Sequence, residues 1–278
     1  MKFHDPELAK ANRHLLEPLV AELRAFEWAE VPCAVCGEAT DLSEPFEKWD
    51  IAMRTCNRCD HLFVTPRMPD EAMPVLYGSR YWDDYTRAIG SPTIKERLPF
   101  DHANGLGKLR RDVLPFRTSG RLIDVGGSSG GLVRQALDLG FDAVGLEPAP
   151  EICELARSVH GVTMYCGALR DQGFADASFD IVTLHDVLEH MFEPVDELRE
   201  IRRILAPGGL FVCETPTSSS LNFADLGADG WSTVSPLEHV HLFNEQNAAR
   251  VLEETGFRIV DLYCPHEDNW IAIAEAPA

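Results

Sequence analysis

The sequence has no apolar run approaching the roughly 18 residues that a membrane-spanning helix needs. Its first residues turn acidic at Asp5 and lead into no apolar stretch of the kind that forms a secretory signal. Internal repeats and low-complexity tracts are absent too. These absences predict a globular cytoplasmic protein without a membrane partner.

Basic residues are also scarce, with 25 Lys and Arg against 45 Asp and Glu and a formal net charge of −20. They occur in short pairs, Arg110-Arg111 and Arg202-Arg203, and never in a long run. Polyphosphates are bound mainly through cationic surface, and an acidic protein repels them. The composition therefore disfavours nucleic acid as a partner and indicates that the acidity mainly supports solubility.

Cysteine is present in a pattern that is more typical of metal binding than of disulfides. Of the eight cysteines, four form two C-x-x-C pairs, Cys33 with Cys36 and Cys56 with Cys59, separated by nineteen residues. Without an export signal, this spacing favours a Zn²⁺ ion held by four thiolates, with unligated cysteines or a redox pair as the alternatives. Four protein ligands leave no open position, so the predicted zinc is structural. The other cysteines are expected to be buried free thiols: Cys153, Cys166, Cys213 and Cys264.

The chain divides into four segments by pattern. An amphipathic helical segment, kinked or split at Pro18, precedes the cysteine-bearing segment. A connecting segment follows, with an aromatic cluster at Tyr77, Tyr81 and Trp82 and a helix over residues 93–114. The predicted boundaries are 1–30 for the helical segment, 31–66 for a zinc ribbon, 67–118 for the connection and 119–278 for the largest domain.

From Gly120 onward, strands alternate with helices. Strands are predicted over 121–125, 141–146, 162–166, 179–184, 209–214, 256–262 and 270–274, and helices over 132–139, 150–160, 195–205 and 246–255. This alternation predicts an α/β fold, a Rossmann-like doubly wound sheet of seven mostly parallel strands with helices on both faces. The last two strands are joined without a helix, so one of them should be antiparallel.

A glycine-rich loop, residues 126–131, follows the first of these strands, and Glu147 lies at the end of the second. Ligands of open α/β sheets bind beyond the carboxyl ends of the strands, where glycines let the backbone approach closely. An acidic residue at the position of Glu147 suits the two hydroxyl groups of a ribose. A dinucleotide would require G-x-G-x-x-G, whereas here Gly126, Ser128 and Gly130 recur at every second residue after Asp124.

This spacing resembles the D-x-G-x-G-x-G motif of class I S-adenosylmethionine (SAM) methyltransferases, with Ser128 in place of the middle glycine. The blocks 176–190, 203–212 and 252–260 are similar to later motifs of that superfamily, in the same order. The resemblance implies SAM as cofactor. It also implies a set of cofactor-binding residues: Asp124, Gly126, Ser128, Gly130, Glu147, Ala168 beside the adenine, and His185 facing the methyl donor.

A second resemblance comes from the order of two C-x-x-C pairs, an aromatic segment, the SAM fold and the pair Glu238-His239. Zinc-ribbon methyltransferases that act on nucleotide-linked deoxysugars have this order. They carry another large C-terminal domain, which has no counterpart in these 278 residues. The resemblance implies O- or C-methylation of a small molecule, with a sugar or natural-product intermediate as the preferred acceptor.

Histidines are the candidates for removing a proton from such an acceptor, because they exchange protons near neutral pH. His239 is the first candidate, with Glu238 orienting it or the substrate, and His185 is the second. If residues 238–243 run extended, His239 and His241 project to one face and Glu238 to the other. Two alternative functions are an RNA methyltransferase that binds substrate through the ribbon and a catalytically silent zinc-ribbon binding protein.

Overall fold

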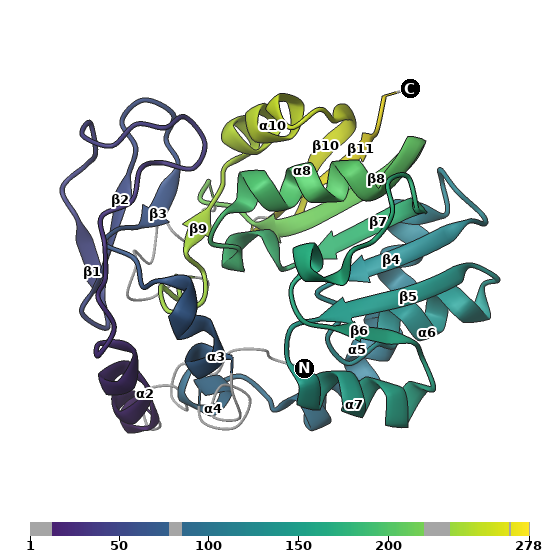
Figure 1. Ribbon diagram of the computed structural model, residues 1–278, viewed down its shortest axis with the longest axis horizontal. Coiled ribbons are helices and arrows are strands. Elements are labelled where there is room, and N and C mark those ends of the chain that lie inside the picture. The colour runs from purple at the N-terminus through teal and green to yellow at the C-terminus, as the bar shows by residue number, and fades with distance from the viewer. Residues whose placement is uncertain (1–12, 78–84, 220–233, 267, 278) are drawn as a thin grey trace.

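The computed structural model describes residues 13–77, 85–219, 234–266 and 268–277 (Figure 1). Its main feature is a seven-stranded sheet with the order β10-β11-β8-β7-β4-β5-β6. The strands are β4 (Arg121–Val125), β5 (Asp142–Glu147), β6 (Met164–Cys166), β7 (Phe179–His185), β8 (Leu205–Pro216), β10 (Arg258–His266) and β11 (Asn269–Glu275).

Strand β4 lies between β5 and β7 and is parallel to both. Of these seven strands, β11 alone runs in the direction opposite to the other six, and it is antiparallel to both of its neighbours, β8 and β10. The predicted α/β fold with a mostly parallel seven-stranded sheet and one antiparallel strand is confirmed. Because strand order reverses on the two sides of β4, the loop after β4 lies where such sheets bind ligands.

Helices cover both faces of this sheet (Figure 1). Ile123 and Val125 of β4 face the apolar layer that includes α8 (Pro194–Ile204) and α10 (Glu245–Glu254), whereas Leu122 faces the opposite layer. This alternation is what a strand buried on both faces requires. The helices of the opposite layer are α5 (Ile94–Lys108), which continues as the π-helical turn η4 (Leu109–Val113), α6 (Gly131–Asp138) and α7 (Pro150–His160).

A second, antiparallel sheet has the order β1-β2-β3-β9. Strands β1 (Phe46–Lys48), β2 (Ile51–Thr55) and β3 (Leu62–Val64) come from the cysteine-bearing segment, whereas β9 (His241–Leu242) comes from the late part of the chain. Phe63 of β3 is in register with His241 of β9. The N-terminal segment is therefore tied by backbone pairing to the residues that directly follow Glu238-His239.

The N-terminal helical prediction is tested from residue 13 onward. A 3-10 turn, η1 (Arg13–Leu15), precedes α2 (Leu16–Leu23), and Pro18 lies in the first turn of α2. Proline is tolerated there because the first amides of a helix have no intrahelical acceptor. Pro18 therefore lies near the start of α2, and not at a kink or break inside a longer helix. Short helical turns η2 (Asp70–Ala72), α3 (Met73–Leu76) and α4 (Thr86–Ala88) follow the second sheet.

Three cysteines differ from the prediction of buried free thiols. Cys153 of α7 and Cys166 of β6 form a disulfide, because the helix packs directly against that edge strand. Cys264 is exposed, and its thiol hydrogen-bonds Glu245 Oε1 at 2.9 Å. Cys213 is buried and free, as predicted. Within the described ranges, no helix is both long and apolar enough to cross a membrane.

Candidate functional site

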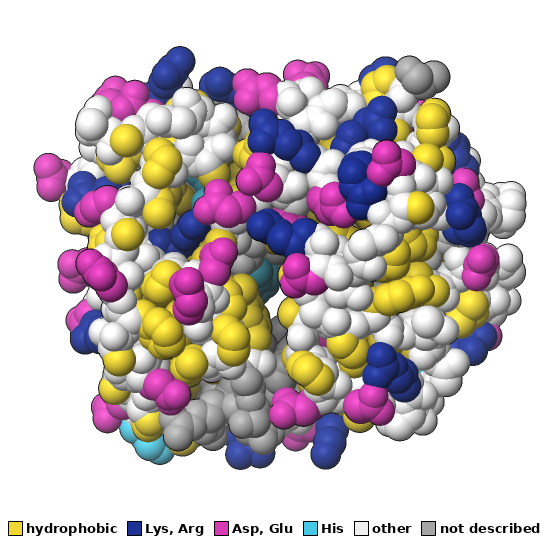
Figure 2. Space-filling model, viewed as in Figure 1, with side chains coloured by type: hydrophobic (Ala, Val, Ile, Leu, Met, Phe, Trp, Pro, Cys, Tyr) yellow, Lys and Arg dark blue, Asp and Glu magenta, His cyan; other side chains and the backbone are white. Residues whose placement is uncertain are grey.

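A cavity of about 1330 Å³ lies beyond the carboxyl ends of β4, β5 and β7. On one side it is lined by the glycine loop and Glu147, and on the other by Tyr77, His190 and His239. Figure 2 shows a hollow at the centre of the molecular face that it presents, with histidine visible inside the hollow. Ligand pockets commonly measure about 300–1,000 Å³, so this space can hold a nucleoside cofactor and a small acceptor together.

The glycine loop is held close to the end of β5. The amides of Gly126 and Gly127 donate to the Leu146 carbonyl at 2.8 and 2.9 Å. Gly126 has φ +75°, and a Cβ atom there would lie 2.2 Å from Cγ2 of Val187. A side chain is excluded by both the backbone conformation and the contact. The loop can therefore present bare backbone to a ligand.

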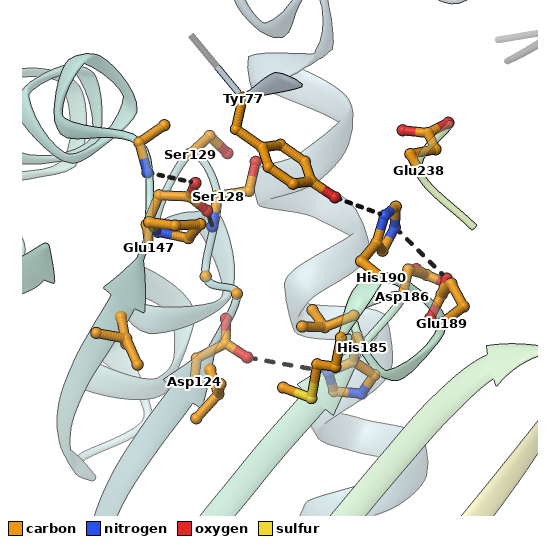
Figure 3. A pocket seen from close by; sticks show the side chains of 18 of the residues that line it. Tyr77, Asp124, Ser128, Ser129, Glu147, His185, Asp186, Glu189, His190 and Glu238 are labelled. Carbon is orange, nitrogen blue, oxygen red and sulfur yellow. Dashed lines mark hydrogen bonds and ion pairs between the residues drawn. The ribbon is translucent and has the colours of Figure 1, made fainter. Parts of the chain in front are cut away.

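Glu147 lies beside this loop with its carboxyl group in a fixed position (Figure 3). Oε2 accepts from the Ser128 amide at 3.2 Å and Oε1 from the Ala149 amide at 3.1 Å. The side chain is buried, and burial raises the pKa of Glu147 to about 7 against the lowering effect of the two amides. Each oxygen retains a lone pair for a ligand hydroxyl.

Asp124 and His185 lie at the floor of the cavity. Asp124 Oδ1 accepts from Thr183 Oγ1 at 2.6 Å, which fixes the carboxylate at the end of β4. His185 Nδ1 lies 4.0 Å from Asp124 Oδ1, and its Nε2 lies 3.8 Å from Asp112 Oδ2. Burial and the Lys108 ammonium act to lower the pKa of His185, but the two carboxylates outweigh them and raise it.

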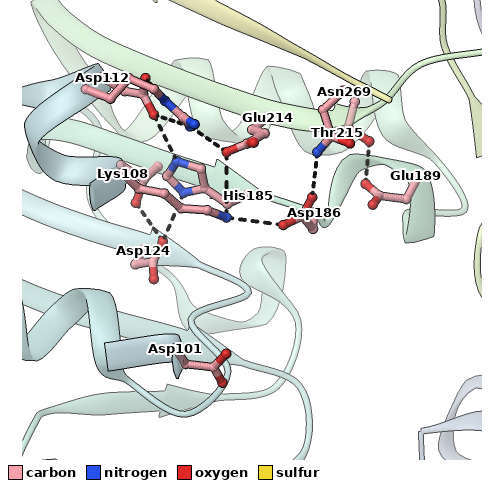
Figure 4. Close-up of polar contacts among 12 residues, drawn as sticks. Asp101, Lys108, Asp112, Asp124, His185, Asp186, Glu189, Glu214, Thr215 and Asn269 are labelled. Carbon is pink, nitrogen blue, oxygen red and sulfur yellow. Dashed lines mark hydrogen bonds and ion pairs between the residues drawn. The ribbon is translucent and has the colours of Figure 1, made fainter. Parts of the chain in front are cut away.

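Further charged side chains surround His185 (Figure 4). Lys108 Nζ donates to Asp186 Oδ2 at 3.1 Å, and Arg111 donates to Glu214 Oε2 at 2.8 Å. His185 therefore belongs to a network of alternating charges in which its own side chain is only 6% exposed, whereas that of Asp186 is 51% exposed. Such surroundings hold an imidazole in place more than they leave it free to reach an acceptor.

The opposite wall of the cavity contains His190, which is not among the predicted site residues. Tyr77 Oη lies 3.2 Å from His190 Nδ1, and Glu189 Oε1 lies 3.8 Å from His190 Nε2 (Figure 3). Burial, together with the neighbouring His239, lowers the pKa of His190 to about 4. The ring is therefore neutral at pH 7.

Glu189 lies at the bottom of this wall. Its Oε2 accepts from Thr215 Oγ1 at 2.5 Å, and the side chain is fully buried. Burial raises the pKa of Glu189 well above the ordinary value, and the Asp186 carboxylate adds to the effect. Glu189, His190 and Tyr77 could have been suspected only from two signals: a Glu-His pair soon after β7, and an aromatic cluster in the connecting segment.

Glu238 and His239 complete the wall from a turn that begins at Ser235. The amides of Glu238 and His239 both donate to the Ser235 carbonyl, at 2.9 and 2.8 Å. The His239 ring packs edge-on against His190 with centroids 4.7 Å apart, and its Nε2 lies 3.9 Å from Glu238 Oε1.

The extended conformation considered for residues 238–243 is therefore wrong for its first part. His241 enters β9 and faces the second sheet, where its buried Nδ1 lies 3.0 Å from His61 Nε2. His239 instead faces the cavity. The difference arises because the turn that begins at Ser235 reaches His239, whereas the alternation of a strand begins only at His241. Tyr81 and Trp82 of the aromatic cluster lie outside the described residues.

The four cysteines of the C-x-x-C pairs converge at a separate place. Their sulfur atoms all lie within 4.8 Å of one another, with 3.5 Å between Cys33 and Cys59 and between Cys36 and Cys56. The cluster lies near α10, because Asn247 Nδ2 donates to the Cys59 carbonyl at 3.4 Å. It is therefore tied to the helix that follows β9.

Comparison with known proteins agrees with this fold. A family model described as a methyltransferase domain matches residues 101–262, which is more than half of the chain. The chain belongs to this family of methyltransferase domains.

Similar curated proteins include two named ubiquinone biosynthesis O-methyltransferase. The one from Cereibacter sphaeroides is 36% identical over 116 residues, covering 40% of this chain and 47% of the relative. The one from Roseobacter denitrificans is 34% identical over 131 residues, covering 43% and 51%. The chain thus spans about half the length of these relatives.

Solved structures show the same fold at low sequence identity. A SAM-dependent methyltransferase from Archaeoglobus fulgidus has a TM-score of 0.53 at 14% identity and covers 65% of this chain and 97% of its own. The [4+2]-cyclase SpnF has a TM-score of 0.51 at 18% identity and covers 64% and 81%. A cyclase with this fold illustrates that architecture alone does not fix the reaction.

Proposed function

We propose that the chain methylates a small molecule at oxygen or carbon, and that a sugar or natural-product intermediate is the preferred acceptor. The observation that supports this most directly is the continuity of one cavity from the glycine loop and Glu147 to the wall with Glu238 and His239. Alignment of the two reactants in one enclosed space is the main requirement of methyl transfer.

The residues on the loop side fit SAM. Gly126 leaves no room for a side chain, and both oxygens of Glu147 are positioned to accept hydrogen bonds from ribose hydroxyls. When bound, SAM supplies a methyl group on a positively charged sulfur. In this proposal the cofactor is held by Asp124, Gly126, Ser128, Gly130, Glu147 and His185, with Ala168 beside the adenine.

On the opposite wall, His239 takes up the proton of the acceptor, and Glu238 orients the ring or the acceptor. His239 is the stronger candidate because it faces the cavity from a turn with its side chain 15% exposed. His185, the second candidate, is enclosed by Asp112, Asp124 and their partners. Its proposed place is therefore on the cofactor side.

The test is the substitution His239→Ala. We expect it to abolish formation of S-adenosylhomocysteine with a panel of hydroxylated acceptors, while isothermal titration gives nearly unchanged SAM affinity. His14→Ala, at an exposed position of a 3-10 turn that does not line the cavity, serves as the matched control. Unchanged turnover in His239→Ala would remove His239 as the base.

The cysteine cluster is proposed to hold a structural Zn²⁺ ion. The support is the mutual approach of four thiol groups, a donor set that Zn²⁺ binds tetrahedrally in closed sites. On this basis we retain the division into a helical segment, a zinc ribbon, a connection and a methyltransferase domain, at residues 1–30, 31–66, 67–118 and 119–278.

An intermediate of ubiquinone biosynthesis is a second candidate for the acceptor. It is favoured by the similarity to proteins named ubiquinone biosynthesis O-methyltransferase, which covers 40% of the chain. An RNA acceptor is disfavoured by the net charge of −20. A catalytically silent protein is disfavoured because the fixed carboxyl groups of Asp124 and Glu147 both line the cavity.

A further inference from the structure

Three potential metal ligands meet on the acceptor side of the cavity. One donor atom from each of Glu189, His190 and His239 lies within 4.8 Å of the other two. They come from segments far apart in the chain: the 3-10 turn η6 (Leu188–His190) and the turn at residues 235–239. All three line the same cavity as the glycine loop. Ligand separations in this range are compatible with one shared cation.

In His190 and Glu189, the atom that points away from the proposed metal position already has a polar partner. Tyr77 Oη lies 3.2 Å from His190 Nδ1, and Thr215 Oγ1 donates to Glu189 Oε2 at 2.5 Å. The other atom of each group, His190 Nε2 and Glu189 Oε1, points toward that position, and the two atoms lie 3.8 Å apart. Metal-binding histidines and carboxylates are typically oriented in this way, by a second set of partners on the atoms that do not touch the metal.

A second observation points to a ligand at this position. Glu189 is 0% exposed, and its Oε1 has no hydrogen-bond partner among the residues that the structure describes. A buried polar oxygen without a partner is destabilising, and the large majority of such atoms are satisfied. Oε1 is directed at His190 Nε2, so a cation between them would give Oε1 the partner that it lacks (Figure 3).

We propose that Glu189, His190 and His239 bind a divalent first-row transition-metal ion in the acceptor half of the cavity. Two imidazoles and one carboxylate suit ions such as Mn²⁺ or Zn²⁺ and leave coordination positions open for water or substrate. The site differs in this respect from the cysteine cluster, whose four thiol groups would close a coordination sphere.

The catalytic consequence of this site depends on the proposed methyltransferase function. An acceptor hydroxyl on the cation would be acidified, and a second oxygen beside it would complete a chelate. The O–H bond breaks, its electron pair stays on the acceptor oxygen, and the proton passes to the Glu238 carboxylate. With the cation bound, His239 is a metal ligand and Glu238 replaces it as the proton acceptor. Without the cation, His239 keeps the role given to it in the proposed function. The acceptor class is then a compound with adjacent oxygen donors.

Electron paramagnetic resonance of added Mn²⁺ tests the site on the full chain. One equivalent of Zn²⁺ is added first to fill the thiol site, because thiolates bind Zn²⁺ in preference to Mn²⁺. We expect one bound Mn²⁺ per chain. The isosteric Glu189→Gln should weaken binding about 10-fold or more. His239→Gln, at a more exposed position, should do the same and serves if the buried variant does not fold. Glu193→Gln is the matched control, because Glu193 lines the cavity but pairs with Arg67.

Absence of saturable Mn²⁺ binding, or equal affinity in Glu189→Gln, His239→Gln and the unchanged protein, would overturn the inference. SAM affinity is measured by isothermal titration on the same samples without metal. Loss of SAM binding together with an intact Mn²⁺ site would count against the proposed function alone. Retained SAM binding without Mn²⁺ binding would count against the metal site alone.

Discussion

At the scale of single residues, the carboxyl group of Glu147 combines burial with two backbone hydrogen bonds. Burial favours the protonated form, whereas the amides of Ser128 and Ala149 favour the ionised form. The first effect is larger, so the pKa lies near 7. A cofactor whose hydroxyls donate to this group requires the ionised form, which links cofactor binding to pH.

We therefore expect SAM to bind more tightly as the pH rises toward 7 and with constant affinity above about pH 8. Because the raised pKa leaves Glu147 protonated below pH 7, binding must release a proton there. The affinity should fall by up to about tenfold for each pH unit below the pKa. Isothermal titration in buffers of different ionisation enthalpy measures this proton release. Glu147→Gln should bind weakly with no such dependence, and an unchanged pH profile in that variant would refute the assignment.

Gly126 allows a second prediction at this scale. Gly126→Ala combines a left-handed φ with a Cβ 2.2 Å from Val187, whereas Gly161→Ala at φ +63° would place its Cβ in open space. The control should lose about 1–2 kcal/mol of unfolding free energy through backbone strain. Gly126→Ala should lose about 1–3 kcal/mol more and bind SAM poorly. Urea unfolding of both variants measures the difference, and equal stability would show that the Val187 contact does not matter.

That the proposed cofactor-side residues lie close together can be predicted from the sequence, because their arrangement is local. Asp124, Gly126 and Glu147 follow directly from strand ends, and the structure places them around one cavity. The acceptor side is less predictable. His190 contacts Tyr77 across 113 positions of sequence, and His239 turns away from His241 because Ser235 begins a turn. No periodic pattern encodes such contacts.

At the scale of elements, β9 joins the two sheets. It pairs with β3, and Phe243, directly after it, forms a bridge with Thr217 beyond the end of β8. The turn with Glu238 and His239 immediately precedes β9. The cysteine-bearing segment therefore supports the acceptor wall through backbone pairing, although its sulfur atoms form a site separate from the cavity.

This arrangement predicts that loss of zinc affects turnover more than cofactor affinity. Cys56→Ser should remove the zinc ion held by the four thiol groups, so that bound zinc falls by one ion per chain. It should also lower the melting temperature, because a structural metal stabilises the folded segment. SAM affinity should change less than turnover, since the glycine loop belongs to the other sheet. Elemental analysis, thermal unfolding and titration measure these quantities. Cys264→Ser, at an exposed free thiol, is the control. A zinc content that is zero before substitution would contradict the zinc assignment.

At the scale of the whole molecule, the α/β fold could be predicted because alternating strands and helices leave few possible topologies. The seven strands and their one antiparallel member agree with the sheet. The pairing of β3 with β9 could not be predicted, since it joins residues about 180 positions apart through two very short strands. The disulfide of Cys153 with Cys166 was missed for a similar reason: it depends on how α7 packs against β6.

The charge of the whole molecule gives a further prediction. With a net charge of −20 and acidic side chains spread among basic ones over the face seen in Figure 2, the chain should bind RNA weakly. Filter binding at low salt should show no tight complex. Tight binding that falls steeply with added salt would instead support an RNA acceptor.

A crystal structure with S-adenosylhomocysteine bound tests the central claim most directly. We expect both ribose hydroxyls to donate to Glu147 and the sulfur atom to face the wall formed by Glu238, His239 and His190. A ribose bound elsewhere, or a sulfur atom facing away from that wall, would contradict the account.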